Sequence, residues 1–219
     1  MRVIAVDGVA PGIGKSTLAA ALAVRLHERG SVVEHFREED ILSRPAFGAV
    51  ARQFQETGRV EPVLLLSATE RYLRDLRHDG VGVAVLDSLL PFVPSLLAWG
   101  HDLPTITAFV RDLTGILAQT RPLLVYLYGP VGAALERAVH REGEAWLSWL
   151  IGRYAGAADP VTDLPSLHAH LDSRRRLTLR MLADCGWNLL VVADAHSRGT
   201  EEIVAMVSAH PWECGRPDR

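Results

Sequence analysis

Lysine is almost absent from this sequence. Lys15 is the only lysine among 219 residues, against 22 arginines, and Asn188 is the only asparagine. A chain that uses arginine wherever any cation suffices keeps lysine where a planar guanidinium would serve poorly, because the ammonium is compact and sits on a flexible stem. We therefore expect Lys15 to have a specific task.

Cysteine is also scarce, and so is an excess of charge of either sign. Cys185 and Cys214 are far apart in the sequence and form no C-x-x-C pair, which argues against a disulfide scaffold and favours a reducing cytoplasm. The formal charge of −3 and a pI of about 6.3 argue against a protein that coats nucleic acid.

Long uninterrupted apolar runs are missing as well. The most apolar stretch, residues 81–99, contains Asp87, Pro91 and Pro94, whereas a membrane-spanning helix needs about 18 or more apolar residues in a row. The first residues begin a strand pattern and carry no signal peptide. We expect a soluble, cytoplasmic protein with no membrane partner.

What the chain does contain is an alternation of runs rich in Val, Ile and Leu with helical patterns, which predicts a single α/β domain over residues 1–219. A chain of this length can bury a sizeable core by itself. The predicted buried parallel strands are residues 3–7, 31–36, 81–87, 123–128 and 189–193. The predicted helices are residues 16–29, 44–57, 62–77, 94–99, 104–119, 131–141, 167–185 and 201–209, with a loose tail over 210–219.

Residues 8–17, G-V-A-P-G-I-G-K-S-T, join the first predicted strand to the first predicted helix, and we call them the glycine loop. They nearly match the phosphate-binding pattern G-x-x-x-x-G-K-[ST]. Val9 holds the place of the leading glycine, and Gly8 comes one residue earlier. A loop between a strand and a helix is the context in which backbone N–H groups and a helix N-terminus bind an anion.

The glycine loop therefore predicts a nucleoside triphosphate site. In this interpretation backbone N–H groups hold the phosphates, Lys15 bridges the β- and γ-phosphates, and the Ser16 hydroxyl ligates Mg²⁺. The residues that we expect to bind the nucleotide are Gly12, Ile13, Gly14, Lys15, Ser16 and Thr17.

Acidic residues end two of the predicted strands. Asp87 ends the strand 81–87, and Glu38 follows the strand 31–36. Ligands of open parallel sheets bind at the carboxyl ends of strands, so both carboxylates are expected beside the glycine loop. We expect Glu38 to take the proton of an acceptor and Asp87 to order Mg²⁺ through water. The reverse assignment, a capping role for Asp87 and a solvated turn at Glu38 are the alternatives.

Arginines follow the fourth predicted strand. Arg137 and Arg141 lie four residues apart on one predicted helix, so they can clamp a transferring phosphoryl group, or they can simply be solvated. The run from Arg174 to Arg176 is more typical of a solvent-exposed helix face. Trp146 and Trp149 either cover a ring of a ligand or pack in the core.

With these pieces in place, the chain resembles the thymidylate kinase and deoxynucleoside kinase branch of the P-loop kinases over about residues 2–141. The segments that carry the resemblance are IAVDGVAPGIGKST, FRE after the second strand, VLDS at the third strand and RPLLVYLYGPVGAALERAVHRE.

The resemblance implies a P-loop NTPase fold: a three-layer α/β sandwich with a five-stranded parallel sheet in the order 2-3-1-4-5 and helices on both faces. It implies ATP as donor, Mg²⁺ as cofactor and an arginine-bearing lid, here about residues 131–160. The residues that match the family's motifs are implied to be catalytic, namely Lys15, Glu38, Asp87, Arg137 and Arg141. Ser16 and Asp87 are implied to bind Mg²⁺.

Two departures from the family pattern bear on the acceptor. The family's Asp-Arg pair after the third strand is Asp87-Ser88 here, and the segment SLLAWG lacks the glutamine that reads a thymine ring. A small-molecule acceptor with a free hydroxyl, such as a nucleoside or a natural product, therefore fits better than thymidylate.

Two other functions stay open. A nucleoside monophosphate kinase would need another arginine for the acceptor phosphate, with Arg44 and Arg71 as candidates. A regulatory ATPase or GTPase is the other, although the chain has no N/T-K-x-D motif and no glutamate after Asp87. A homodimer is a possible assembly.

Overall fold

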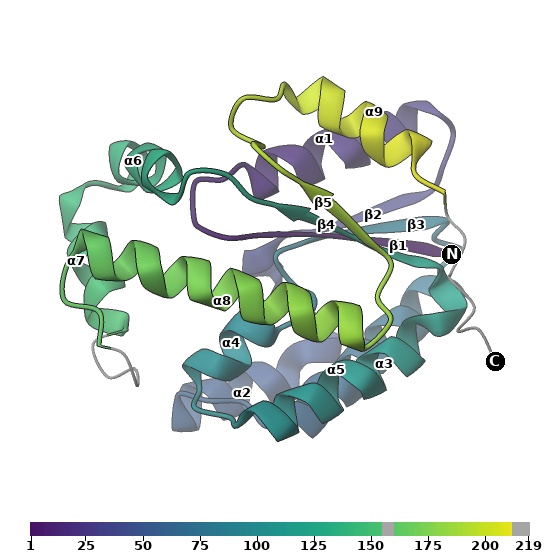
Figure 1. The fold of residues 1–219 in the computed structure, drawn as a ribbon. Helices are drawn as coiled ribbons and strands as arrows, with labels where there is room; N and C mark the ends of the chain where they lie inside the picture. Colours follow the sequence, from purple (N-terminus) through teal and green to yellow (C-terminus); the bar gives the residue numbers. More distant parts are fainter. Residues whose placement is uncertain (155–159, 212–219) are drawn as a thin grey trace.

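A computed structural model describes residues 1–154 and 160–211 of the chain (Figure 1). Within these ranges the strands form a five-stranded parallel sheet in the order β2-β3-β1-β4-β5, which confirms the expected strand order. The strands are β1 (Arg2–Gly8), β2 (Val33–Phe36), β3 (Val83–Asp87), β4 (Pro122–Leu127) and β5 (Leu189–Val192).

β1 lies at the centre of the sheet and sets the register of its neighbours. Val6 of β1 lies opposite Asp87 of β3 on one side and opposite Val125 of β4 on the other. Because every pairing is parallel, the carboxyl ends of the strands meet at one edge of the sheet. The glycine loop leaves the sheet at this edge, next to the ends of β3 and β4.

The helices agree with the predicted ones except in a few places. They are α1 (Lys15–Glu28), α2 (Gly48–Thr57), α3 (Pro62–His78), α4 (Val93–Ala98), α5 (Leu103–Leu117), α6 (Val131–Glu142), α7 (Glu144–Arg153), α8 (Leu164–Asp184) and α9 (Thr200–Ala209), with short 3₁₀ turns η1 (Glu38–Leu42), η2 (Pro45–Phe47) and η3 (Ala118–Thr120).

α7 is the helix that the sequence pattern did not predict. Gly143, with φ of 90°, separates it from α6. The apolar residues of α7 run almost continuously from Trp146 to Ile151, so they lack the one-sided spacing that identifies an amphipathic helix. α6 and α7 occupy the region expected to be a lid, of which residues 155–159 lie outside the described ranges, as do residues 212–219 of the expected tail.

Helices cover both faces of the sheet, as expected for a three-layer sandwich. α1 and α9 lie over one face, α3 and α5 lie over the other, and α6 and α7 lie beyond the carboxyl ends of the strands (Figure 1). Side chains alternate along β1, so that Val3 and Ala5 join one buried cluster while Ile4 and Val6 join the other. In the described ranges no helix is both long and apolar enough to span a membrane; residues 81–99 form β3 and α4 instead.

An aromatic cluster fixes the segment that follows β2. The rings of Phe36, Phe47 and Tyr72 meet with centroids 5.1 to 5.8 Å apart, and both phenylalanines are fully buried. The Tyr72 hydroxyl donates to Glu34 at 3.3 Å, and Arg44 pairs with the same carboxylate. These contacts connect α3 to both ends of the segment that contains Glu38.

We expect Phe47→Ala to lower the free energy of unfolding by about 3–5 kcal/mol, because it deletes a buried ring and leaves a cavity. Phe54→Ala on the adjoining α2 is the control, since its ring is 40% exposed, and it should cost about 1 kcal/mol or less. Urea unfolding of the two variants measures both values. Equal losses would show that the cluster does not anchor this segment.

Candidate functional site

The glycine loop makes a tight turn between β1 and α1. Gly12 and Gly14 have φ of 78° and 105°, values that favour glycine. A Cβ on Gly12 would also lie 2.1 Å from the Ala134 carbonyl oxygen of α6. The backbone of the loop therefore approaches the backbone of α6 more closely than any other residue type would allow.

The displaced first glycine of the motif has a structural reason. The Val9 N–H donates to the Leu127 carbonyl of β4 at 3.0 Å, and its side chain is buried. A Cβ on Gly8 would lie 2.8 Å from both the Leu127 carbonyl oxygen and Ile13 Cγ2. Because β4 and Ile13 crowd the chain at Gly8 rather than at Val9, the loop needs its first glycine one residue earlier.

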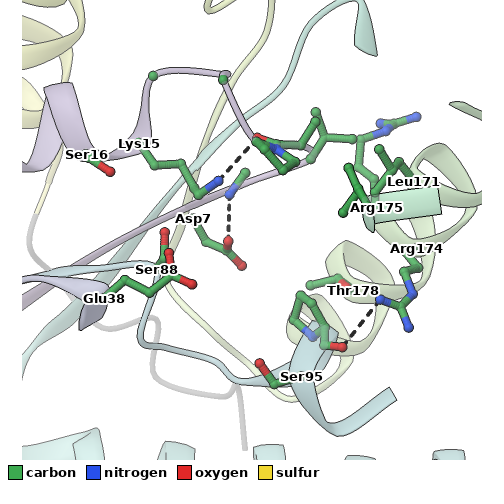
Figure 2. Close-up of a pocket in the computed structure, with 18 of the residues that line it drawn as sticks. Asp7, Lys15, Ser16, Glu38, Ser88, Ser95, Leu171, Arg174, Arg175 and Thr178 are labelled. Atoms are coloured by element: carbon green, nitrogen blue, oxygen red, sulfur yellow. Dashed lines mark hydrogen bonds between the residues drawn. The ribbon is translucent and has the colours of Figure 1, made fainter. Parts of the chain in front are cut away.

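The amino end of α1 presents groups that suit an anion. The first helical hydrogen bond at this end joins Leu18 N–H to the Gly14 carbonyl at 3.0 Å, and no side chain caps the helix. The N–H groups of the first turn are therefore left for a ligand. Lys15 folds across the loop and donates from Nζ to the Ala10 carbonyl at 3.2 Å (Figure 2).

Glu38 and Asp87, the two acids expected at the strand ends, differ in whether they reach the cavity in front of the glycine loop. Glu38 is the first residue of η1 and lines the cavity in front of the glycine loop. Burial raises the pKa of its carboxyl, and Lys15 opposes the rise. Asp87 is 3% exposed and does not line the cavity; Ser88, which does, donates to its Oδ1 at 3.0 Å.

Asp7 is a third acid at this edge, and the sequence reasoning missed it. It lies one residue before the glycine loop and accepts a hydrogen bond from the Gly8 N–H at 2.8 Å (Figure 2). Burial raises its pKa from 3.8 to about 6, against the opposing effect of Lys15. The argument from strand ends that singled out Glu38 and Asp87 applies equally to Asp7, which belongs to the last residues of β1.

Both arginines of the predicted pair on α6 line the cavity. Arg137 donates from Nε to the Gly12 carbonyl at 3.1 Å, so α6 already contacts the loop in this structure. Arg141 is exposed and pairs with Glu142 at 2.7 Å.

A cavity of about 610 Å³ connects these groups. Of the residues expected to form the site, Gly12, Gly14, Lys15, Ser16, Thr17, Glu38, Arg137 and Arg141 line it. Ile13 does not, because its side chain is buried beneath the loop. In the described ranges no group of three or more His, Cys, Asp or Glu side chains could hold a metal ion.

The far wall of the cavity comes from α4, α7 and α8, and sequence reasoning identified little of it. Its lining residues include Ser95, Trp146, Trp149, Arg153, Tyr154, Arg174, Arg175 and Thr178. Arg174 and Arg175 belong to the run of arginines that was expected to lie on a solvent-exposed helix face. Only Arg176, which is exposed and paired with Asp172, fits that expectation. Consecutive residues of a helix point in different directions, and the side chains of Arg174 and Arg175 point into the cavity.

Comparison with known proteins gives a fold but no function. No protein-family model matches the chain, and no curated protein is similar to it in sequence. Among solved structures, it is similar to the crystal structure of APE1195, with 18% identity and a TM-score of 0.50 over 94% of this chain and 91% of that one. At this identity the similarity shows the α/β fold alone.

The raised pKa of Asp7 predicts a pH-dependent stability. The folded state binds this proton more tightly than the unfolded chain, so the contribution is present below about pH 4 and is lost as the pH rises through about 6. Asp7→Asn removes this dependence. Relative to the variant, the native protein should lose on the order of 3 kcal/mol of unfolding free energy between pH 4 and 7.

Urea unfolding across this pH range measures the difference. Asp102→Asn is the contrasting control: Thr105 donates to Asp102 and holds its pKa below the usual range, so the native protein should instead lose stability relative to that variant as the pH falls. Parallel pH profiles for the native protein and Asp7→Asn would mean that Asp7 is not held in a desolvating site.

Proposed function

We propose that this protein is an ATP- and Mg²⁺-dependent kinase that transfers the γ-phosphoryl group of ATP to a hydroxyl of a small molecule, such as a nucleoside or a natural product. The observation that carries the proposal is that the chain's only lysine, in a glycine loop at a helix N-terminus, shares one cavity with the carboxylate of Glu38 and two arginines.

The described residues fit a triphosphate. Gly14 lines the cavity with open space where a Cβ would lie, and the N–H groups of the first turn of α1 have no side-chain cap. Lys15 needs only to exchange the Ala10 carbonyl for a phosphate oxygen. Arg137 is already directed at the loop through Gly12 and could add a second cation beside the phosphates.

When bound, ATP would supply the phosphoryl group and Mg²⁺ would neutralise part of its charge. Ser16 would ligate the ion directly, and Asp87, which lies beneath Ser88 outside the cavity lining, would act on it through water. The protein's own task is to position these groups and to receive a proton. Glu38 suits the second task, because it lines the cavity in front of the glycine loop and desolvation raises the pKa of its carboxyl.

The shape of the cavity supports a transferase over a regulatory NTPase. The space extends past the glycine loop to Ser95 and Thr178, which leaves room for a second substrate. The two arginines that a nucleoside monophosphate kinase would use for the acceptor phosphate, Arg44 and Arg71, do not line the cavity. Arg44 pairs with Glu34 and Asp40, and Arg71 is exposed.

The proposal is tested by a screen for acceptor-dependent consumption of ATP. The panel contains nucleosides, nucleoside monophosphates and hydroxylated antibiotics. A compound phosphorylated on a hydroxyl supports the proposal, and transfer only to the phosphate group of the monophosphates contradicts it.

Lys15→Ala should leave the fold intact and lower the transfer rate by several powers of ten, since positioning and charge neutralisation supply most of the catalysis in phosphoryl transfer. Lys15→Arg should also be badly impaired, because a planar fork cannot replace the ammonium between two phosphates. Steady-state kinetics with an acceptor from the screen, with circular dichroism as the folding control, checks both. Near-normal turnover by either variant would contradict a phosphate-binding role for the loop.

Glu38→Gln and Asp87→Asn should separate proton transfer from metal binding. Losing a positioned base costs roughly 10²–10⁴-fold in rate, so Glu38→Gln should lower kcat at least a hundredfold while the Mg²⁺ requirement stays normal. Asp87→Asn should instead raise the Mg²⁺ concentration needed for half-maximal rate. Normal turnover by Glu38→Gln, with Asp87→Asn inactive at saturating Mg²⁺, would reverse the two roles.

A further inference from the structure

Arg174 projects from α8 into the wall of the cavity that faces the glycine loop. Its side chain is half-buried and lies over the ring of Tyr154, with Cζ 4.9 Å from the centroid. One terminal nitrogen, Nη1, donates to the Pro94 carbonyl of α4 at a long 3.4 Å (Figure 2). The Tyr154 side chain, through its ring and its hydroxyl, and the Pro94 carbonyl hold the guanidinium in place but use only part of its five N–H donors.

No carboxylate neutralises Arg174 within residues 1–154 and 160–211. Two other cavity arginines are paired with acids: Arg175 with Asp172 at 2.8 Å, and Arg141 with Glu142 at 2.7 Å. Removing a cation from water without a partner is costly, so a half-buried, unpaired guanidinium is a natural place for an anion to bind.

Arg153 adds a second cation to the same wall. It lies on α7, lines the cavity, contacts the ring of Trp149 with Cζ at 5.6 Å from the centroid, and forms no ion pair within the described residues. Two arginines on different helices, each oriented by an aromatic ring, resemble a receptor for an oxyanion more than a solvated surface.

Arg174 lies on the side of the cavity opposite the glycine loop. Figure 2 shows Ser95, Thr178 and Arg174 gathered together, with Ser16, Lys15 and Glu38 across the open space from them. The phosphates of a nucleotide on the glycine loop have their own cations, Lys15 and Arg137, so Arg174 is left for the other substrate.

We propose that the acceptor carries an oxyanion, a carboxylate or a phosphate ester, in addition to its reacting hydroxyl, and that Arg174, assisted by Arg153, binds this group. The proposal rests on the proposed kinase function, and it narrows the acceptor class from hydroxylated molecules in general to anionic ones. Arg174 is thereby a specificity-determining residue, with Ser95 and Thr178 beside it.

The test measures binding of a free oxyanion when the phosphate site is already filled. The protein is saturated with Mg²⁺ and the β,γ-imido analogue of ATP, and labelled inorganic phosphate or labelled acetate is then added in equilibrium dialysis. Native protein should bind at least one of the two probes, and the stronger one indicates whether the acceptor's group is a phosphate or a carboxylate.

Arg174→Met keeps most of the side-chain volume and removes the charge. It should weaken binding of the favoured probe at least tenfold, as expected for the loss of charged hydrogen bonds, whereas Arg174→Lys should retain part of it. Arg176→Met, two positions along the same helix and outside the cavity, is the control and should bind like the native protein. Should Arg174→Met fail to fold, Arg153→Met at an exposed position should still weaken binding severalfold.

Unchanged binding by Arg174→Met, or no binding by the native protein, would overturn the proposal. Failure of the kinase function has a different signature, because the nucleotide analogue would then not bind at all. In that case the nucleotide-free protein still reports on Arg174: phosphate binding that is lost in Arg174→Met but kept in Lys15→Ala places the oxyanion at Arg174.

Discussion

The close contact between the glycine loop and the backbones of β4 and α6 is the constraint on which the rest of the site depends. Val9 is held by the Leu127 carbonyl, and Gly12 fits against the Ala134 carbonyl where a Cβ would come within 2.1 Å. β4 and α6 are consecutive in the chain, so one segment fixes both ends of the loop. The same contact brings Arg137 to the loop, since it lies on α6 one turn after Ala134.

Opposing charges are concentrated around this loop. Asp7, Glu38 and Asp87 meet at the carboxyl ends of β1, β2 and β3, and their mutual repulsion and burial are opposed mainly by Lys15. Arginines from α6, α7 and α8 surround the rest of the cavity. The acids thus lie on the sheet and most of the cations on the helices beyond it. This arrangement suits a reaction in which an anionic donor and an acceptor meet above a carboxylate.

Much of this arrangement could be predicted from the sequence, because the strands are short buried runs and the glycine loop has a recognisable pattern. Nearly all helices follow from that reading, as do the positions of Lys15, Glu38, Arg137 and Arg141 around one cavity, whereas the sheet order was implied by the family resemblance. α7 escaped prediction because its apolar residues are nearly continuous, and only Leu150 among them is buried. Asp87 was expected at the cavity surface but lies beneath Ser88.

The wall made by Arg153, Arg174 and Thr178 could not be predicted, because its residues come together only through the packing of α4, α7 and α8. Nothing in the run from Arg174 to Arg176 distinguishes the members that turn inward from the one that stays in solvent. That distinction depends on the rotation of α8 against α4, α5 and α6, which one sequence does not specify.

The central claim is that the glycine loop holds the phosphates of a nucleotide. Amide hydrogen exchange of the native protein with and without ATP and Mg²⁺ tests it most directly, because it needs no acceptor. The account predicts that exchange slows at Gly12, Gly14, Lys15, Ser16 and Thr17, whose N–H groups would bind phosphate oxygens. Unchanged exchange in this loop at saturating ATP would contradict it.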